Sequence, residues 1–332
     1  MGTYADKASI TSTITSLGDL HAARNRLRGI TTRSRLIELE HPDTSRRLWL
    51  KPENQQPIGA FKLRGAYNKI ASLTDEERQL GVITYSSGNH AQGVAYAARA
   101  LKTKAIIVMP SNAPAIKQQA TAKLGAEIVF VGQGSEERKA KAEQLAAEHG
   151  YIVVPPYDDE KIIAGQGTIA LEILEDLPEV ETVLVPIGGG GLISGVAAAI
   201  KLTKPSVKVI GVEPELAADA LASFRAGKVV QFPAEQVSRT LADGLRTQSV
   251  GEINFAHMQR FVDDIITVAE DEIRGAVKLL AANSQTIAEP SGAVATAGFL
   301  FHRKELPETK LNVAIISGGN VEPEMLEDFR RK

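Results

Sequence analysis

Short runs of aliphatic and β-branched residues alternate along this chain with longer, alanine-rich amphipathic runs. The short runs predict strands at residues 48–51, 81–84, 105–109, 127–131, 151–154, 182–186, 207–212 and 313–316. The longer runs predict helices at residues 60–73, 90–101, 115–124, 136–149, 166–175, 192–202, 270–283 and 292–304. Strands that alternate with helices pair in parallel, so the pattern predicts an α/β fold built on doubly wound, mainly parallel sheets.

The length and one rigid joint suggest two domains. A chain of 332 residues is long enough for two domains. The sequence Pro155-Pro156-Tyr157 is the clearest joint, because proline restricts the backbone and interrupts helices. We therefore expect a large domain made of residues 1–80 and 156–332, and a small domain of residues 81–155.

The composition argues against several classes of function. The net charge is −2 and aromatic residues make up 5%, whereas a nucleic-acid-binding surface needs a basic excess and stacking rings. The chain has no cysteine, so disulfides and thiolate metal sites are ruled out. Residues 183–200 are apolar, but Pro186 and the glycines at 188–191 interrupt them, and residues 1–10 contain no apolar run. We expect a cytoplasmic protein with neither a nucleic-acid nor a membrane partner.

The run Gly188-Gly189-Gly190-Gly191 follows one predicted strand and opens the next helix. Uncovered backbone N–H groups and the positive end of a helix together favour a bound phosphate. A tight turn alone would need only one glycine, whereas this run has four. The run lacks the G-x-G-x-x-G pattern of dinucleotide sites and the lysine with Ser or Thr of triphosphate loops, so a monophosphate fits better. Polar loops also follow predicted strands at 86–90 and 317–320, where parallel sheets bind ligands.

Lys62 stands at the start of a predicted helix, within the sequence GAFKLRGA at residues 59–66. A lysine in such a place is usually a solvated surface residue. However, a phosphate-binding loop and two polar loops elsewhere in the chain are what a cofactor that forms an imine with lysine requires. Lys62 is therefore a candidate for that lysine.

Seven short segments together resemble the serine/threonine dehydratase and serine racemase family of pyridoxal-phosphate enzymes, and they occur in the family's order. They are residues 60–66 (AFKLRGA), 86–93 (SSGNHAQG), 108–110 (VMP), 163–168 (IAGQGT), 188–192 (GGGGL), 289–292 (EPSG) and 317–320 (SGGN). The resemblance covers residues 48–320. It implies the tryptophan-synthase-β-like fold, fold type II of these enzymes, with the cofactor bound by the large domain.

The resemblance also implies roles for individual residues. Lys62 would bind pyridoxal phosphate covalently and act as the base at the substrate's Cα. Asn89 would contact the ring hydroxyl, and the hydroxyl of Ser317 would leave the ring nitrogen largely neutral, which suits β-elimination. The expected cofactor-binding residues are Lys62, Phe61, Asn89, Gly188, Gly189, Gly190, Gly191 and Ser317. The expected substrate-binding residues are Ser86, Ser87, Asn89, His90 and Arg138.

The predicted reaction is loss of water from a 3-hydroxy amino acid, which gives an enamine that tautomerises and is hydrolysed to a 2-oxo acid and ammonia. The substrate would be threonine, serine or a bulkier relative such as phenylserine. Because the chain ends shortly after Asn320, we expect no C-terminal regulatory domain and a catabolic or specialised role. Relatives with this architecture are often dimers, so we expect a homodimer.

Two positions keep other reactions open. Ser87 is alanine in biosynthetic-type threonine dehydratases and serine in racemase-like members, where a hydroxyl opposite Lys62 could move a proton and permit racemisation. Arg138 corresponds to an arginine of racemase-like relatives and could pair a second carboxylate, as in 3-hydroxyaspartate, although an exposed helix arginine is the commoner interpretation. Ala60 stands where the family usually has serine, which indicates an altered or roomier pocket.

Glu213 and Asp219 lie close together after a predicted strand. On spacing alone, a solvated acidic loop is the commoner interpretation. The resemblance to racemase-like members instead implies a Mg²⁺ or Ca²⁺ site, in which the carbonyl of Ala217 and waters would complete the ligands.

Overall fold

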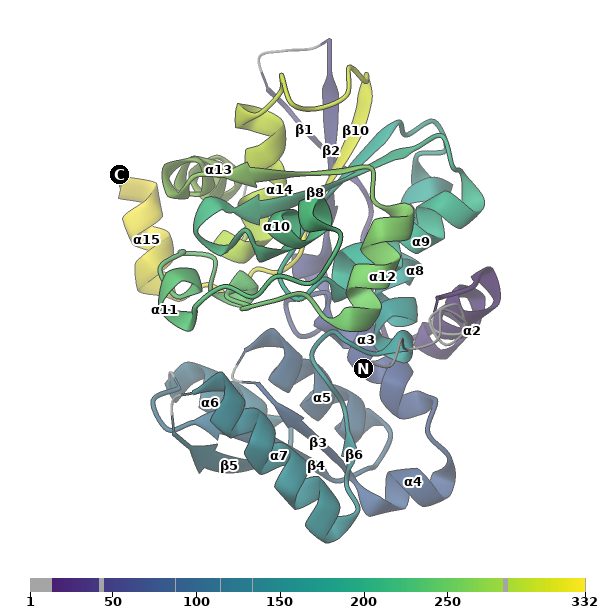
Figure 1. Ribbon diagram of the computed structural model, residues 1–332, viewed down its shortest axis with the longest axis vertical. Helices are drawn as coiled ribbons and strands as arrows, with labels where there is room; N and C mark the ends of the chain where they lie inside the picture. The colour runs from purple at the N-terminus through teal and green to yellow at the C-terminus, as the bar shows by residue number, and fades with distance from the viewer. Residues whose placement is uncertain are drawn as a thin grey trace, which may run out of the picture.

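The strands of this chain form two separate sheets, one above the other in the view of Figure 1. The structure is a computed structural model that describes residues 14–41, 45–86, 88–113, 115–132, 134–282 and 286–331. We refer to the larger sheet with the helices that cover it as the large lobe, and to the smaller sheet with its helices as the small lobe.

The sheet of the large lobe has six strands in the order β1-β2-β10-β7-β8-β9. They are β1 (Ile37–Leu39), β2 (Arg47–Pro52), β10 (Leu311–Ile316), β7 (Thr182–Pro186), β8 (Lys208–Pro214) and β9 (Asp264–Val268). Every neighbouring pair is parallel except β1 with β2. Strands β2, β7, β8 and β10 are those that the sequence predicts, whereas β1 and β9 were not predicted.

The sheet of the small lobe has four strands in the order β5-β4-β3-β6, and all neighbouring pairs are parallel. They are β5 (Glu127–Val131), β4 (Ala105–Pro110), β3 (Val82–Tyr85) and β6 (Ile152–Val153). Two mainly parallel sheets confirm the predicted fold class.

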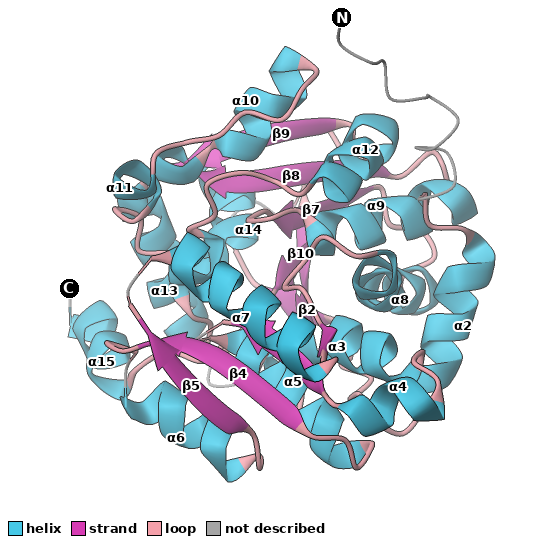
Figure 2. Ribbon diagram, turned by 60° about the horizontal axis from the view of Figure 1, so that its bottom comes forward, coloured by secondary structure: helices cyan, strands magenta, loops and turns pink. Residues whose placement is uncertain are grey.

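Helices cover both faces of each sheet, as Figure 2 shows. In the large lobe, one apolar core packs α2 (Leu17–Leu27), α8 (Glu160–Asp176), α9 (Gly191–Thr203) and α12 (Glu252–Phe261) on one face of the sheet. A second core packs α13 (Glu270–Ala282) and α14 (Pro290–Phe301) on the other face. In the small lobe, α5 (Asn89–Ala100) and α7 (Ser135–His149) pack on opposite faces. The remaining helices are α3 (Lys62–Ala71), α4 (Asp75–Leu80), α6 (Ala115–Lys123), α10 (Asp219–Ala226), α11 (Ala234–Val237) and α15 (Pro323–Arg331).

Helix α8 begins earlier than the sequence pattern predicts, at Glu160 instead of residue 166. The Asp159 side chain caps it, because its Oδ1 accepts hydrogen bonds from the N–H groups of Lys161 (2.8 Å) and Ile162 (3.1 Å). Gly165 made this helix start hard to recognise in the sequence, because glycine is unfavourable inside a helix. The structure explains that glycine, because a Cβ there would lie 2.6 Å from the carbonyl oxygen of Arg64 on the neighbouring α3.

Helix α3 lies between the two lobes in Figure 1 and packs against both α5 and α8. Its apolar residues, such as Leu63 and Ile70, share a core with the small-lobe strands. The predicted domain boundaries at residues 80 and 155 stay a prediction.

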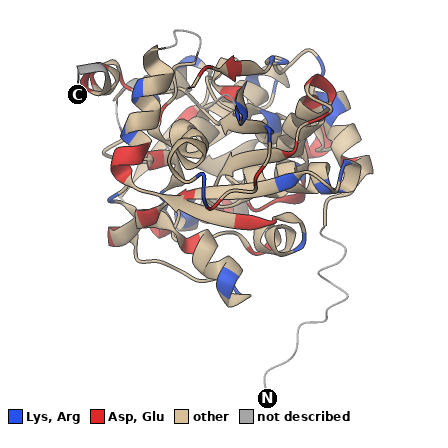
Figure 3. Cartoon of the chain, turned by 90° about the horizontal axis from the view of Figure 1, so that it is seen from above, with Lys and Arg blue, Asp and Glu red and all other residues tan. Residues whose placement is uncertain are grey.

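Acidic and basic segments are intermixed in the view of Figure 3, as expected for a chain whose charges nearly cancel. Within the described ranges, no helix combines the length and the apolar character that crossing a bilayer would require.

Candidate active site

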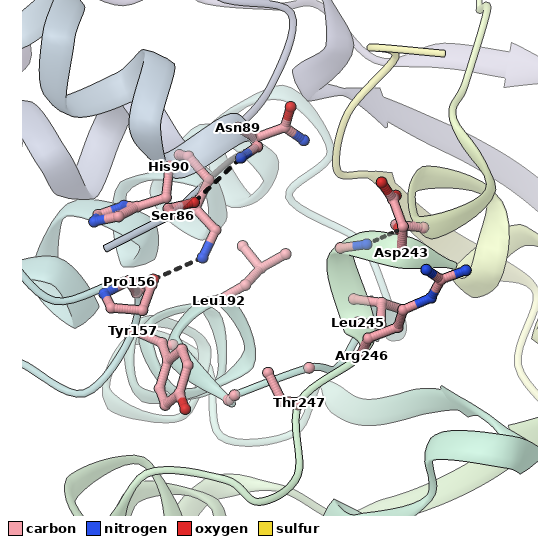
Figure 4. A pocket seen from close by; sticks show the side chains of 18 of the residues that line it. Ser86, Asn89, His90, Pro156, Tyr157, Leu192, Asp243, Leu245, Arg246 and Thr247 are labelled. Carbon is pink, nitrogen blue, oxygen red and sulfur yellow. Dashed lines mark hydrogen bonds between the residues drawn. The ribbon is translucent and has the colours of Figure 1, made fainter. Parts of the chain in front are cut away.

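A cavity of about 420 Å³ lies between the two lobes. Its walls come from the carboxyl ends of strands and the loops that follow them: Tyr85, Ser86 and residues 88–90 at β3, Pro186 and residues 188–192 at β7, and Ser317 after β10. Figure 4 shows Ser86, Asn89 and His90 on one side, and Asp243, Leu245 and Arg246 on the other. The sequence analysis singled out three of these loops, and the fold brings them together around one space.

Lys62 is the first residue of α3 and lines this cavity. Its position follows from a backbone connection, because the N–H of Phe61 donates to the carbonyl of Ser317 (3.0 Å) and Ala60 forms a β-bridge with Gly318. The Lys62 Nζ donates to the carbonyl oxygen of Pro156 at 2.6 Å. Burial lowers the pKa of Lys62 to about 8, so a substantial share of the amine is neutral and nucleophilic near that pH.

The glycine loop, defined as residues 188–191, connects β7 to α9 and lines the cavity with all four residues. A Cβ on Gly189 would lie 2.3 Å from the ring of Tyr157, and one on Gly191 would lie 3.0 Å from the Tyr157 side chain. Gly190 has φ of +92°, in the left-handed region that favours glycine. Only glycines allow this close approach, and the exposed N–H groups at a helix start fit a phosphate group.

Asn89 begins α5, and its amide is held by two partners. Its Nδ2 donates to Oε1 of Glu289 (2.7 Å), and its Oδ1 accepts from Nδ2 of Asn320 (2.7 Å). Because Nδ2 carries two hydrogens, one remains for a group in the cavity.

His90 is buried, and its Nε2 lies 3.0 Å from the carbonyl oxygen of Val154. Burial and, to a smaller extent, the charge of Lys62 lower the pKa of His90 to about 3, so the ring is neutral. Its Nδ1 has no hydrogen-bond partner in the part of the chain that the structure describes. Ser86 lines the cavity beside it, whereas Ser87 lies outside the described residues.

Ser317 is buried, and its hydroxyl donates to the carbonyl oxygen of Ser291 at 3.4 Å. Glu289, which also lines the cavity, was quoted in the EPSG segment without a role. Burial, reinforced by the charge of Asp243, raises the pKa of Glu289 to about 8. A carboxyl group that titrates near neutral pH beside Asn89 was not predictable from sequence position alone.

Arg138 of α7 lines the same cavity from the small lobe. It is half-buried, and burial lowers the pKa of its guanidinium, which nevertheless remains protonated. Its Nε donates weakly to the carbonyl oxygen of Gly134, at 3.4 Å. This arrangement brings a cation to the cavity.

Sequence reasoning missed several other residues of the cavity wall. They are Tyr157, Lys117, Asp243, Arg246 and Thr247. Tyr157 could have been found from the sequence, because it ends the proline-containing joint at residues 155–157. Lys117 lies in α6, a helix that the sequence predicts, whereas Asp243, Arg246 and Thr247 lie in a stretch for which no helix or strand was predicted.

The predicted cation-binding residues lie together, but none of them lines the cavity. Glu213 is the next-to-last residue of β8, Ala217 ends a 3-10 turn (Glu215–Ala217), and Asp219 begins α10. Glu213 accepts hydrogen bonds from the N–H groups of Ala220 and Leu221, whereas neither carboxylate oxygen of the buried Asp219 has a partner among the described residues. The described residues contain no group of three or more Asp, Glu, His or Cys side chains suited to a metal.

Burial raises the pKa of both carboxyl groups of this pair. That of Asp219 rises to about 7, and that of Glu213 rises well above its ordinary value because Asp219 adds to the effect of burial. The unpartnered oxygens of Asp219, beside a second buried carboxyl group, fit a hard cation.

Comparisons with known proteins agree with this geometry. The family model described as pyridoxal-phosphate dependent enzyme matches residues 27–318. The chain is 42% identical to L-threo-3-hydroxyaspartate ammonia-lyase of Saccharomyces cerevisiae, over 93% of this chain and 94% of the relative. It is also 42% identical to L-threonine ammonia-lyase of Thermotoga maritima, over 96% of this chain and 78% of the relative.

Among solved structures, maize serine racemase superposes with a TM-score of 0.90 at 36% identity, covering 95% of this chain and 96% of the racemase. The family match spans most of the chain, and both relatives are 42% identical to it over more than nine-tenths of its length. This chain therefore belongs to the family of pyridoxal-phosphate dependent enzymes.

Proposed function

We propose that this chain is an ammonia-lyase that removes water from a 3-hydroxy amino acid, after which water hydrolyses the resulting enamine to a 2-oxo acid and ammonia. The observation that carries the proposal is the buried, weakly basic amine of Lys62 in the same cavity as the glycine loop. The ammonia-lyases among the relatives support the reaction type.

Pyridoxal phosphate, when bound, supplies an electron sink that stabilises negative charge at the Cα of an amino acid. We propose that the N–H groups of the glycine loop bind its phosphate, with Phe61 beside it. The free hydrogen of the Asn89 amide would bind the ring hydroxyl, and Ser317 would bind the ring nitrogen. These residues would hold the cofactor in the cavity that Lys62 lines.

The Lys62 amine would remove the proton from Cα and, once protonated, would deliver a proton to the departing 3-hydroxyl, which then leaves as water. Burial helps, because it keeps the amine available as a base near neutral pH. Ser86, Asn89 and His90, together with Ser87, would bind the substrate carboxylate. The neutral imidazole of His90 adds no charge there, so hydrogen bonds from the turn and the start of α5 would orient the carboxylate.

The first experiment measures 2-oxo acid release from L- and D-serine, threonine, 3-hydroxyaspartate and 3-phenylserine, with the purified protein and added pyridoxal phosphate. We expect turnover of at least one substrate and a loss of roughly 10²–10⁴-fold or more in Lys62→Ala, because the base is removed. Lys69→Ala is the matched control, since Lys69 lies on the same helix and pairs with Asp159 (2.6 Å) outside the cavity. No turnover across the panel would refute the dehydratase proposal.

We propose 3-hydroxyaspartate as the most specific candidate within this class. The half-buried guanidinium of Arg138 supplies a cation for a second carboxylate, and the relative from Saccharomyces cerevisiae is named for this substrate. Replacement Arg138→Met should raise KM for 3-hydroxyaspartate by roughly 10- to 100-fold, since a charged hydrogen bond contributes about 1.5–3 kcal/mol. Turnover of threonine or serine should change little. Equal losses for all substrates would contradict this role.

Racemisation of a serine-type amino acid is the second candidate, supported by the similarity to maize serine racemase. Chiral analysis of the amino acid left in the same assays distinguishes the two reactions. Enantiomer formation without 2-oxo acid would favour the racemase and exclude the lyase.

We further propose that Glu213, Asp219 and the carbonyl of Ala217 bind Mg²⁺ or Ca²⁺. The unpartnered oxygens of Asp219 support this, and the ion would neutralise two buried carboxyl groups and fix the start of α10. Millimolar Mg²⁺ or Ca²⁺ should raise Tm, by an amount equivalent to about 2.7 kcal/mol at a hundred times Kd. Asp219→Asn should remove this response, whereas Glu215→Gln, at an exposed position of the same turn, should keep it. An unchanged wild-type Tm would count against the site.

The homodimer and the cytoplasmic location stay predictions of the sequence. Analytical ultracentrifugation of the purified protein tests the first, and cell fractionation tests the second.

A further inference from the structure

The glycine loop is held from outside the cavity by helix α12. The carbonyl oxygen of Gly189 accepts two hydrogen bonds, one from the N–H of Gly251 at 3.1 Å and one from the side-chain Nδ2 of Asn254 at 2.8 Å. Gly251 immediately precedes α12, and Asn254 is a fully buried residue of its first turn. One carbonyl of the loop therefore has two donors from the same helix end.

The chemistry of the contact fixes the orientation of the Asn254 amide. A carbonyl oxygen only accepts hydrogen bonds, so the atom that faces Gly189 must be the amide nitrogen. The amide oxygen then points elsewhere, and it is buried without a partner among the residues that the structure describes. An unsatisfied buried oxygen is unfavourable, and leucine would fill a similar volume without it. The hydrogen bond from the Asn254 side chain to the Gly189 carbonyl is thus the contact that explains an amide at position 254.

Fixing the Gly189 carbonyl also fixes the next N–H group. In a planar trans peptide the C=O and the following N–H point in opposite directions. Because the carbonyl of Gly189 points to α12, the N–H of Gly190 points away from α12. The N–H groups of Gly188, Gly189 and Gly190 donate no hydrogen bond to any described residue, and all three residues line the cavity. The amide of Asn254 therefore sets the direction of a free N–H group beside the cavity.

The helix that carries Asn254 is itself anchored next to the loop. The carboxylate of Asp158 accepts hydrogen bonds from the N–H groups of Glu252 (3.2 Å), Ile253 (3.0 Å) and Asn254 (3.3 Å), and so caps the start of α12. Its neighbour Tyr157 packs on Gly189 and Gly191. Asn254 thus acts from a fixed position.

We propose that Asn254 is a positioning residue for the cofactor phosphate, because it holds the Gly189–Gly190 peptide with its N–H directed at the phosphate. The inference rests on the proposed binding of the phosphate by the glycine loop. It predicts that the Asn254 amide contributes to the affinity for the phosphate group and for no other part of the cofactor.

The test compares pyridoxal phosphate with pyridoxal, which lacks the phosphate, in titrations of the ligand-free protein followed by cofactor absorbance. Asn254→Leu should raise the Kd of pyridoxal phosphate roughly 5- to 10-fold, as expected for one lost hydrogen bond. The Kd of pyridoxal should stay at the wild-type value. The Tm of the ligand-free protein should stay the same or rise, since the variant also removes the unpartnered oxygen. A merely structural role would instead lower Tm and leave the ratio of the two Kd values unchanged.

Gln259→Ala is the matched control, because it removes a side-chain amide from the exposed side of the same helix. It should keep both Kd values. If Asn254→Leu does not fold, Asn254→Ala serves for the same ratio. Equal weakening of both ligands, or an unchanged Kd for pyridoxal phosphate, overturns this inference and leaves the proposed function intact. A wild-type protein that binds both ligands equally well overturns phosphate binding by the glycine loop, and this inference with it.

Discussion

Asn89 shows how single side chains are fixed around the cavity. Its amide oxygen accepts from Asn320 and one amide hydrogen is donated to Glu289, so its remaining hydrogen has a defined direction. Asn320 is held in turn, because its Nδ2 also donates to the carbonyl oxygen of Ile58 at 2.8 Å. Three residues from distant parts of the chain thus orient one donor toward the proposed cofactor.

The carboxyl group of Glu289 should make the stability of the ligand-free protein depend on pH. Burial raises its pKa from 4.5 to about 8. A folded-state pKa above the unfolded value means that the contribution to stability is fully present below pH 4.5 and is lost as the pH rises through about 8. Glu289→Gln lacks this titration. Its free energy of unfolding should therefore rise relative to that of the wild type as the pH increases across that interval, by up to about 1.4 kcal/mol per pH unit.

Urea unfolding at a series of pH values checks this prediction. Glu252→Gln, at an exposed position, is the control and should follow the wild type at every pH. Parallel curves for wild type and Glu289→Gln would mean that Glu289 does not titrate in this range.

At this scale, motif resemblance singled out the residues that point into the cavity, and its segments include Glu289 and Asn320, which hold Asn89, but it did not single out Asn254. Lys62, Asn89 and Ser317 stand in recognisable segments, and all three line the cavity. Asn254 stands in no such segment, and its contact with Gly189 joins positions far apart in sequence. Such contacts depend on how helices pack, which a local pattern does not encode.

Helix α3 is the element on which the site depends most, because it carries Lys62 at its start and a buried ion network two residues further along. Arg64 is fully buried and pairs with Glu53 (2.8 Å) and Glu172 (2.7 Å), and Lys51 also pairs with Glu172 (2.6 Å). Burial alone would lower the pKa of Arg64, but the two carboxylates raise it above its ordinary value. The network ties α3 to β2 and to α8.

Arg64→Met should destabilise the protein by about 3–5 kcal/mol, because it leaves the buried carboxylate of Glu53 without its cation. Lys51 still compensates Glu172, so a second change, Glu53→Gln, should restore part of the loss. Thermal or urea unfolding of the two single variants and the double variant checks this. A loss below about 1 kcal/mol for Arg64→Met, or additive effects of the two changes, would show that the buried pair is not formed.

The sequence predicted the elements with strong periodicity and missed those defined by tertiary contacts. The range of β7 was predicted at residues 182–186, where an apolar run begins after Glu181 and is interrupted at Pro186. The antiparallel β1 is only three residues long and depends on its pairing with β2. Helices α10 to α12 were also not predicted, and α10 contacts β9 and α12.

The whole molecule places its cavity between two sheets that the sequence predicted separately. The alternating pattern indicates two parallel sheets, and each sheet brings loops to its carboxyl edge. How the lobes face each other depends on contacts such as that between Lys117 of α6 and Asp243, which are 126 residues apart. No local pattern relates those two positions.

The ion pair between Lys117 and Asp243 joins the lobes at the cavity wall, with 2.7 Å between Nζ and Oδ2. Their side chains are 22% and 41% exposed, so the coupling between them should be only about 0.5–1 kcal/mol and should weaken with salt.

Breaking the ion pair between Lys117 and Asp243 should loosen the contact between the lobes and increase acrylamide quenching of bound cofactor fluorescence. Because one contact is removed in each case, Lys117→Met, Asp243→Asn and the double variant should give the same increase. The pair of Lys104 and Glu127 lies within the small lobe, so Lys104→Met should leave quenching unchanged. Additive effects of the two changes at the cavity would show that these residues act independently, and that other contacts hold the lobes together.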